Sequence, residues 1–120
     1  MLTLPVSVNI WLAAEPVDMR KGFDGLSALV RNGFGADVYS GDLFVFLSRR
    51  RDLAKILFWD GGGFVLVCKR LERSRFRRVT TCGVDTRVRL DAVQLTMLLD
   101  GIEVSRVRRP ERWQPSSPAA

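Results

Sequence analysis

The sequence predicts a small single domain of the α+β class, with a mainly antiparallel sheet of about five strands and one early and one late helix. Short apolar runs alternate with charged or glycine-rich turns through the middle of the chain, and a helical pattern of apolar residues lies on either side of them. At 120 residues the chain is close to the common size of one domain. We expect a compact domain over residues 1–104. Residues 105–120 are basic and then Pro/Ser-rich, which predicts a flexible tail.

The strands are predicted from alternation and from turn residues. Apolar residues occupy every second position from Val6 to Leu12, which is the period of a half-buried strand. Three apolar runs then follow each other closely, separated by one charged turn and one Asp-Gly-Gly-Gly turn. The simplest interpretation is an antiparallel three-stranded meander. Its expected strands are Leu43–Leu47, Leu53–Trp59 and Phe64–Lys69, joined by the turns Ser48–Asp52 and Asp60–Gly63.

The early helix is expected from about Met19 to Asn32, with Asp18 at the position of an N-cap. Two glycines weaken this helix. Gly22 and Gly25 could instead let another backbone approach closely, or move the start of the helix toward Phe23.

The late helix is expected after a short strand at Val88–Leu90. Asp91 can cap its first turn, and Gly101 is placed to end it. The apolar positions between 93 and 99 should close the core. Between the meander and this strand, Leu71 and Phe76 are the clear apolar anchors of an otherwise basic segment.

The excess positive charge of the chain is confined to Asp42–Arg78. This stretch holds ten basic and four acidic residues, a net charge of +6, whereas the remainder carries nine of each. A local basic surface of this kind is typical of proteins that bind polyanions. The candidate nucleic-acid-binding residues are Arg49, Arg50, Arg51, Lys55, Lys69, Arg70, Arg73, Arg75, Arg77 and Arg78.

Each part of this basic stretch has two interpretations. The turn Arg49–Arg51 could pair its guanidinium groups with phosphate oxygens, or it could be a solvated hairpin tip. If Lys69–Arg78 is extended, a continuous basic row results, which could follow a phosphate backbone or merely protect an edge strand from aggregation. Among the tryptophans, Trp59 is expected in the core, and Trp113 is the better candidate for stacking on bases.

Several linked motifs resemble one family. The first run is Asp18-Met19-Arg20-Lys21-Gly22-Phe23-Asp24-Gly25-Leu26, and a later run ends in Trp59-Asp60-Gly61. Together with the segments 69–76 and 94–102, they resemble the TnpB-type accessory proteins, products of the second open reading frame, of the insertion sequence sixty-six family of bacterial mobile elements.

This resemblance implies a protein encoded beside a transposase and needed for efficient movement of the element. The expected partners are therefore DNA, the transposase and other element-encoded proteins, and a homo-oligomer stays open. Binding of DNA or of the transposase–DNA complex is the first hypothesis. An adaptor that docks on the transposase without touching DNA is the second.

A small metal-dependent nuclease is the third and least supported hypothesis. Carboxylates such as Asp24 and Asp60 could hold magnesium, but the chain has no histidine, and capping or turn roles account for most of its aspartates. We therefore expect no enzyme activity, no metal and no cofactor. Cys68 is expected to be a buried reduced thiol and Cys82 a loop thiol. With no long apolar segment and no positively charged leader, the sequence predicts a cytoplasmic protein without membrane contact.

Overall fold

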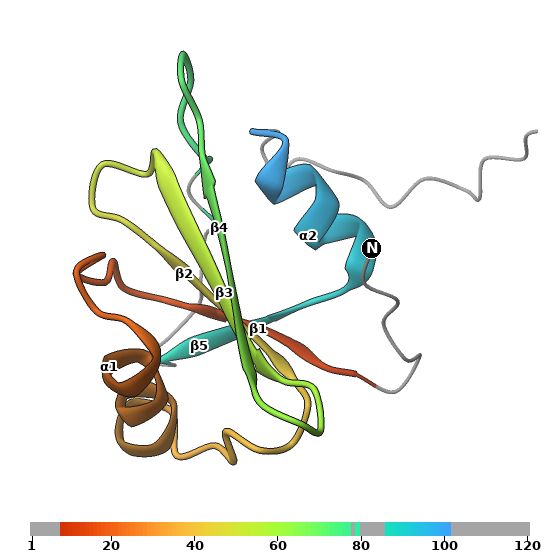
Figure 1. Ribbon diagram of the computed structural model, residues 1–120. Coiled ribbons are helices and arrows are strands. Elements are labelled where there is room, and N and C mark those ends of the chain that lie inside the picture. Colours follow the sequence, from red (N-terminus) through yellow and green to blue (C-terminus); the bar gives the residue numbers. More distant parts are fainter. Residues whose placement is uncertain (1–7, 78, 80–85, 102–120) are drawn as a thin grey trace, which may run out of the picture.

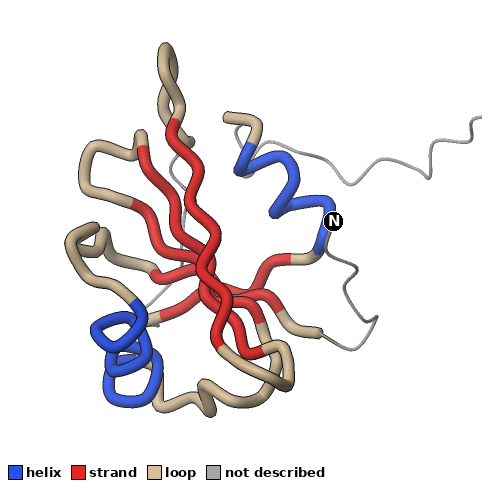
Figure 2. The backbone as a smooth tube through the Cα atoms, in the orientation of Figure 1, coloured by secondary structure: helices blue, strands red, loops and turns tan. Residues whose placement is uncertain are grey.

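A five-stranded sheet in the order β4-β3-β2-β1-β5 organises the computed structural model, which describes residues 8–77, 79 and 86–101 (Figures 1 and 2). The elements follow each other along the chain as β1, α1, η1, β2, β3, β4, β5 and α2. Their bounds are β1 Ile10–Ala13, α1 Phe23–Ala28, η1 Leu29–Gly33, β2 Leu43–Leu47, β3 Leu53–Trp59, β4 Phe64–Arg70, β5 Arg87–Leu90 and α2 Ala92–Leu99. The predicted α+β class, the strand number and the early and late helices are confirmed.

The predicted meander is confirmed as the antiparallel strands β2, β3 and β4. Its register pairs Leu47 with Ala54 across the first turn and Trp59 with Phe64 across the second. The pairing of β1 with β2 is parallel, and β5 returns antiparallel to the other side of β1. As a result β1, β2 and β4 finish, and β3 and β5 begin, at the same end of the sheet.

The two faces of the sheet carry separate cores. On one face, Leu95 and Leu98 of α2 pack with a cluster that includes Ile56 of β3. On the other, Leu26 of α1 packs with a cluster that includes Phe44 of β2. The helices therefore cover opposite faces, as Figure 1 shows. Strand alternation decides which side chains each helix covers.

The early helix begins later than Met19. α1 starts at Phe23 with Gly22 as its N-cap, and no side chain caps it, so the alternative start suggested by the glycines is the one observed. Asp18 is too far from this start to cap it. The last part of the expected helix is π-helical, over Leu29–Gly33. The late helix agrees with prediction: Asp91 and Gln94 form a capping box, and Gly101 follows α2 with a φ of 80°.

One further prediction is wrong, and one conditional arrangement is not adopted. Cys68 is exposed on the edge strand β4 rather than buried. The extended course considered for Lys69–Arg78 is not adopted either, because β4 ends at Arg70 and residues 71–77 form a loop. The predictions for Arg78, Cys82, Trp113 and the tail 105–120 concern residues outside the described part of the chain.

Candidate nucleic-acid interface

The turn between β2 and β3 is fixed by the side chain of Ser48. Its hydroxyl accepts hydrogen bonds from the backbone N–H groups of Asp52 and Leu53, at 3.3 and 3.2 Å, and lies 3.1 Å from Oδ1 of Asp52, to which it donates. The Ser48 N–H also donates to the Leu53 carbonyl at 2.9 Å. A well-connected turn therefore carries the three arginines. Arg49 and Arg50 are exposed and Arg51 is half-buried.

Arg51 adopts a backbone conformation that favours glycine. Its φ is 60°, and among the described residues it is the non-glycine residue with a positive φ. For an L-residue the left-handed region costs roughly 1–2 kcal/mol, and such a conformation persists where surrounding contacts fix it. Glycine could form the same turn without this strain, so an arginine here has a backbone cost that the turn itself does not require.

The loop after β4 is tied to this turn. The Leu71 N–H donates to the Asp52 carbonyl at 2.8 Å, and the Phe76 N–H donates to the Arg51 carbonyl at 2.6 Å. The Phe76 side chain is fully buried in the α2-side core, so the loop is anchored at both ends. We call the turn 48–52 and the loop 71–77 together the arginine loops. Arg73, Arg75 and Arg77 are all exposed within them.

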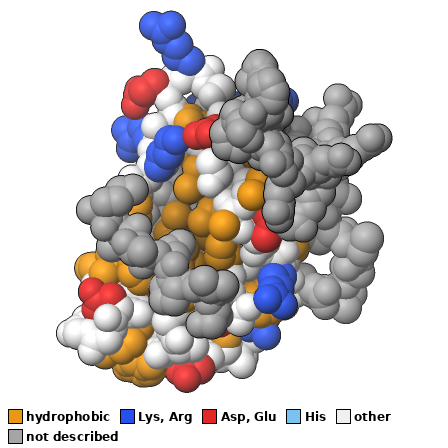
Figure 3. All heavy atoms as spheres, turned by 90° about the vertical axis from the view of Figure 1, so that its right-hand side faces the viewer, with side chains coloured by type: hydrophobic (Ala, Val, Ile, Leu, Met, Phe, Trp, Pro, Cys, Tyr) orange, Lys and Arg blue, Asp and Glu red, His pale blue; other side chains and the backbone are white. Residues whose placement is uncertain are grey.

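The arginine loops form one end of the molecule. In Figure 3, Lys and Arg side chains lie at the upper end with acidic side chains among them, and others lie lower on the same face; the upper end is the one from which the loop after β4 projects in Figure 1. The two basic runs, about twenty residues apart in sequence, are thus neighbours in the fold. Arg77 is partly engaged, since its Nε donates to the Gly101 carbonyl at 3.4 Å.

The other candidate residues lie beside or away from the arginine loops. Arg70 is exposed at the end of β4, and Lys69 forms a long, solvent-exposed ion pair of 3.8 Å with Asp100, a kind of pair that contributes little. Lys55 lies on the α1 face of β3. Its ammonium donates to the carbonyls of Met19 and Lys21, at 2.8 and 3.0 Å, which gives it a structural role.

The residues Asp18–Asp24 form the approach to α1. Asp18 accepts hydrogen bonds from the backbone N–H and the guanidinium of Arg20, the shortest at 2.8 Å. Chiefly because of the Arg20 side-chain hydrogen bond, the pKa of Asp18 is lowered to about 2. A Cβ at Gly25 would stand only 3.0 Å from the Lys21 Cβ, which is a side-chain neighbour rather than the second backbone considered for these glycines, and a Cβ at Gly22 would meet nothing within 4 Å. Gly22, Phe23 and Asp24 are exposed.

The second family motif, Trp59-Asp60-Gly61, lies at the end of the sheet opposite the arginine loops. The Asp60 carboxylate accepts hydrogen bonds from the N–H groups of Gly62 and Gly63, at 2.9 and 3.0 Å, and these bonds lower its pKa. Gly61 has a φ of 98°, which the turn requires. Trp59 is half-buried rather than fully in the core, and its ring packs edge-on against Tyr39 and Phe64.

Sequence reasoning did not select the basic residues of β5. Arg87 lies at the same sheet end as the arginine loops, and its guanidinium stacks 4.2 Å from the centre of the Trp11 ring. The Trp11 Nε1–H donates to Asp42 Oδ2 at 3.3 Å. The alternation Arg87-Val88-Arg89-Leu90 carried the signal, because it predicts two arginines on one face of a strand.

The described residues contain no group of three or more His, Cys, Asp or Glu side chains placed to hold a metal ion. No helix in this part of the chain is long and apolar enough to cross a membrane. The fold and the clustered arginines define a small basic α+β protein whose charged loops gather at one end of a sheet.

Comparison with known proteins assigns this class to a family. The family model described as "IS66 Orf2 like protein" matches residues 8–109, so the chain belongs to the IS66 Orf2-like family. This confirms the resemblance drawn from the sequence, and it makes the chain an accessory protein of transposition.

Two relatives from Sinorhizobium fredii strain NGR234 are similar over nearly their whole length. The uncharacterized protein y4jC is 35% identical over 112 residues, covering 93% of this chain and 94% of its own. The uncharacterized protein y4hO is 36% identical over 117 residues, covering 97% of each chain. No solved structure matches the chain.

Proposed function

We propose that this protein is a non-catalytic accessory factor of transposition that binds DNA, or the transposase–DNA complex, through the arginine loops. The observation that carries the proposal is the hydrogen bond from the Phe76 N–H to the Arg51 carbonyl, which joins two basic runs into one surface. The proposed contacts are Arg49, Arg50, Arg51, Arg73, Arg75 and Arg77, with Arg70 beside them.

The chemistry of this surface suits phosphate. A guanidinium offers paired N–H donors that match two phosphate oxygens, and it stays charged at every physiological pH. Arginines held on a connected turn lose less freedom upon binding than arginines on a free chain. Contacts of this kind position a protein on DNA without reading its sequence, so the proposed binding is salt-sensitive and only weakly selective among sequences.

The test compares charge removal at two places. The double variant Arg49→Ala/Arg50→Ala and the matched control Arg31→Ala/Arg89→Ala each remove two exposed guanidinium groups. Binding to a duplex of element-end or random sequence is measured by anisotropy between about 50 and 200 mM salt. The first variant should weaken binding to both sequences and reduce the salt slope by about two, since each phosphate contact contributes about 0.9. Equal effects of the two variants would refute the assignment.

The adaptor hypothesis is favoured by one feature, the exposed edge strand β4, where Val67 and Cys68 are accessible. Capture of purified transposase after nuclease treatment decides between the two. An association that persists without DNA, together with absent DNA binding at low salt, would establish the adaptor and overturn DNA binding.

The proposal of a non-catalytic role has its own test. Magnesium-dependent cleavage of DNA that is lost in Asp60→Asn or Asp24→Asn would overturn it. A role on DNA also places the protein in the compartment that holds the element, which in bacteria is the cytoplasm.

A further inference from the structure

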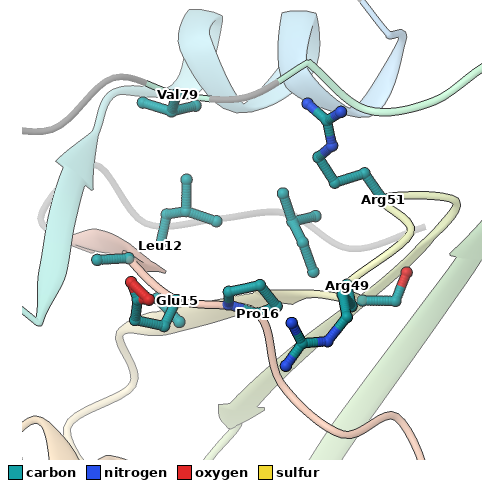
Figure 4. A pocket seen from close by; sticks show the side chains of 10 residues that line it. Leu12, Glu15, Pro16, Arg49, Arg51 and Val79 are labelled. Carbon is teal, nitrogen blue, oxygen red and sulfur yellow. The ribbon is translucent and has the colours of Figure 1, made fainter.

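A cavity of about 430 Å³ opens beside the arginine loops, where the parallel strands β1 and β2 end (Figure 4). Its apolar walls include Leu12 near the end of β1, Leu47 at the end of β2, and Pro16 and Val79. The volume lies within the roughly 300–1,000 Å³ of small-molecule sites. The cavity is therefore large enough for one planar ring system.

The walls of the cavity are tied to the sheet. The Val17 N–H donates to the Leu47 carbonyl at 2.9 Å, and the Ala14 N–H donates to the Thr86 carbonyl at 3.0 Å. These bonds hold the segment that follows β1 across the ends of β2 and β5. The site is thus formed by backbone that hydrogen bonds hold against the sheet.

The charged groups at the cavity come from two segments. Arg49 and Arg51 line it from the turn after β2, and Glu15 lines it from the segment after β1. Figure 4 shows the two arginines on one side of the cavity, with Leu12 and Val79 on the other. Arg50 stands between the two arginines in sequence and does not line the cavity. Two arginines of the turn therefore line the cavity, and the one between them does not.

We propose that this cavity binds one unpaired nucleotide of single-stranded DNA, which deepens and rests on the proposed function. The apolar walls cover the base, Arg49 and Arg51 pair with the flanking phosphates, and Glu15 accepts a hydrogen bond from an amino group of the base. A base in a duplex is stacked and paired, so it cannot enter. The cavity adjoins the exposed arginines of the same turn, so a single strand can follow the charged surface and insert one base.

Glu15 makes the proposal specific. A carboxylate beside a phosphate site is repulsive, so a ligand that is only an anion gains nothing from it. A carboxylate does accept a hydrogen bond from the N4 amino group of cytosine. Thymine presents a carbonyl oxygen at the equivalent position, so cytosine is preferred over thymine in this site.

The principal experiment compares Arg49→Ala with the matched control Arg50→Ala on a short single strand and on a duplex of equal length. Both variants should weaken duplex binding equally. On the single strand, Arg49→Ala should weaken binding about tenfold, the size expected for loss of one positioned arginine contact, and Arg50→Ala much less. Because only an unpaired base enters the cavity, the parent should bind the single strand more tightly than the duplex. A third variant, Ala14→Leu, fills the cavity and should abolish this preference while retaining duplex binding. Thermal unfolding of each variant reports whether it is folded.

The outcomes separate this proposal from the proposed function. If Arg49→Ala and Arg50→Ala are equivalent on single strands, or single strands bind no more tightly than duplex, the cavity does not take a nucleotide although DNA binding stands. If neither form of DNA binds at low salt, both proposals fail. If Arg49→Ala instead weakens capture of the purified transposase and leaves single-strand binding unchanged, the cavity takes a peptide and the nucleotide is refuted.

Base preference gives an independent readout. Oligo-dC should bind more tightly than oligo-dT at neutral pH, and Glu15→Gln should reduce this difference, since a neutral amide is a weaker acceptor than a carboxylate. A Glu15→Gln protein that binds both oligonucleotides more tightly, with the same ratio as the parent, would show that Glu15 only repels phosphate and would overturn its assigned role.

Discussion

Arg51 allows the cost of a strained backbone to be measured apart from the contribution of its side chain to DNA binding. With a φ of 60°, the arginine loses roughly 1–2 kcal/mol relative to an unstrained residue. Glycine relieves this strain, but it loses about 0.5–1 kcal/mol more conformational entropy upon folding. We therefore expect Arg51→Gly to be as stable as the parent or more stable by up to about 1.5 kcal/mol, while its affinity for DNA falls.

The informative control is Arg51→Ala, which removes the same side chain and keeps the strain. Urea unfolding should place Arg51→Ala about 1 kcal/mol below Arg51→Gly in free energy of unfolding, and anisotropy should show the same loss of DNA affinity for both. The backbone bonds of the turn are common to all three proteins, because the N–H and carbonyl of residue 51 remain. A glycine variant less stable than the alanine variant would refute the reasoning, since side-chain packing would then hold the turn. Unchanged DNA affinity in both would remove Arg51 from the interface.

Three further predictions concern the groups around the site. Lys55→Met should lower the free energy of unfolding by about 2 kcal/mol in urea, because two carbonyls of the 19–21 segment lose a charged donor. NMR titration should find that the Asp18 carboxyl has a pKa of about 2. The stabilising contribution of its pair with Arg20 is therefore complete above the ordinary carboxyl pKa of 3.8 and is lost as the pH falls through about 2. A titration midpoint near 3.8 would contradict the pairing. Phe76→Leu should cost about 1–2 kcal/mol and weaken duplex binding more than its stability loss explains, since the buried ring anchors the loop; an unchanged affinity in the folded variant would contradict this.

Much of the fold follows from local patterns. Turn residues bound each strand of the meander. The strands and the order in which they pair were therefore predictable from residues close together in the sequence. The start of α1 was harder to predict. Asp18 has the residue type of an N-cap, but Arg20 binds its carboxylate and Lys55 holds the segment that follows it. A partner 36 residues away leaves no periodic signal in the sequence.

The site was predictable in its composition and not in its assembly. The charge of the two basic runs was evident from counting, but the bond between Phe76 and Arg51 depends on backbone groups that every sequence has. The cavity was harder still to predict from the sequence, because its walls come from separate parts of the chain, namely the segments after β1 and β2 and Val79. Alternation could have identified Arg87, whose stacking on Trp11 only the fold shows.

The position of β1 has a consequence for how the chain is made. Among the strands of the described residues, β1 is synthesised first, yet it lies inside the sheet, between β2 and β5. Its partner in β5, with Ala13 opposite Arg87 and Ile10 opposite Leu90, is synthesised last among the strands. Until then the nascent sheet exposes an edge that carries Ile10 and Leu12, an apolar template for pairing with another chain. A transcript truncated before β5 should therefore yield aggregates rather than a smaller soluble domain, which makes completion of the last strand the step that protects the product.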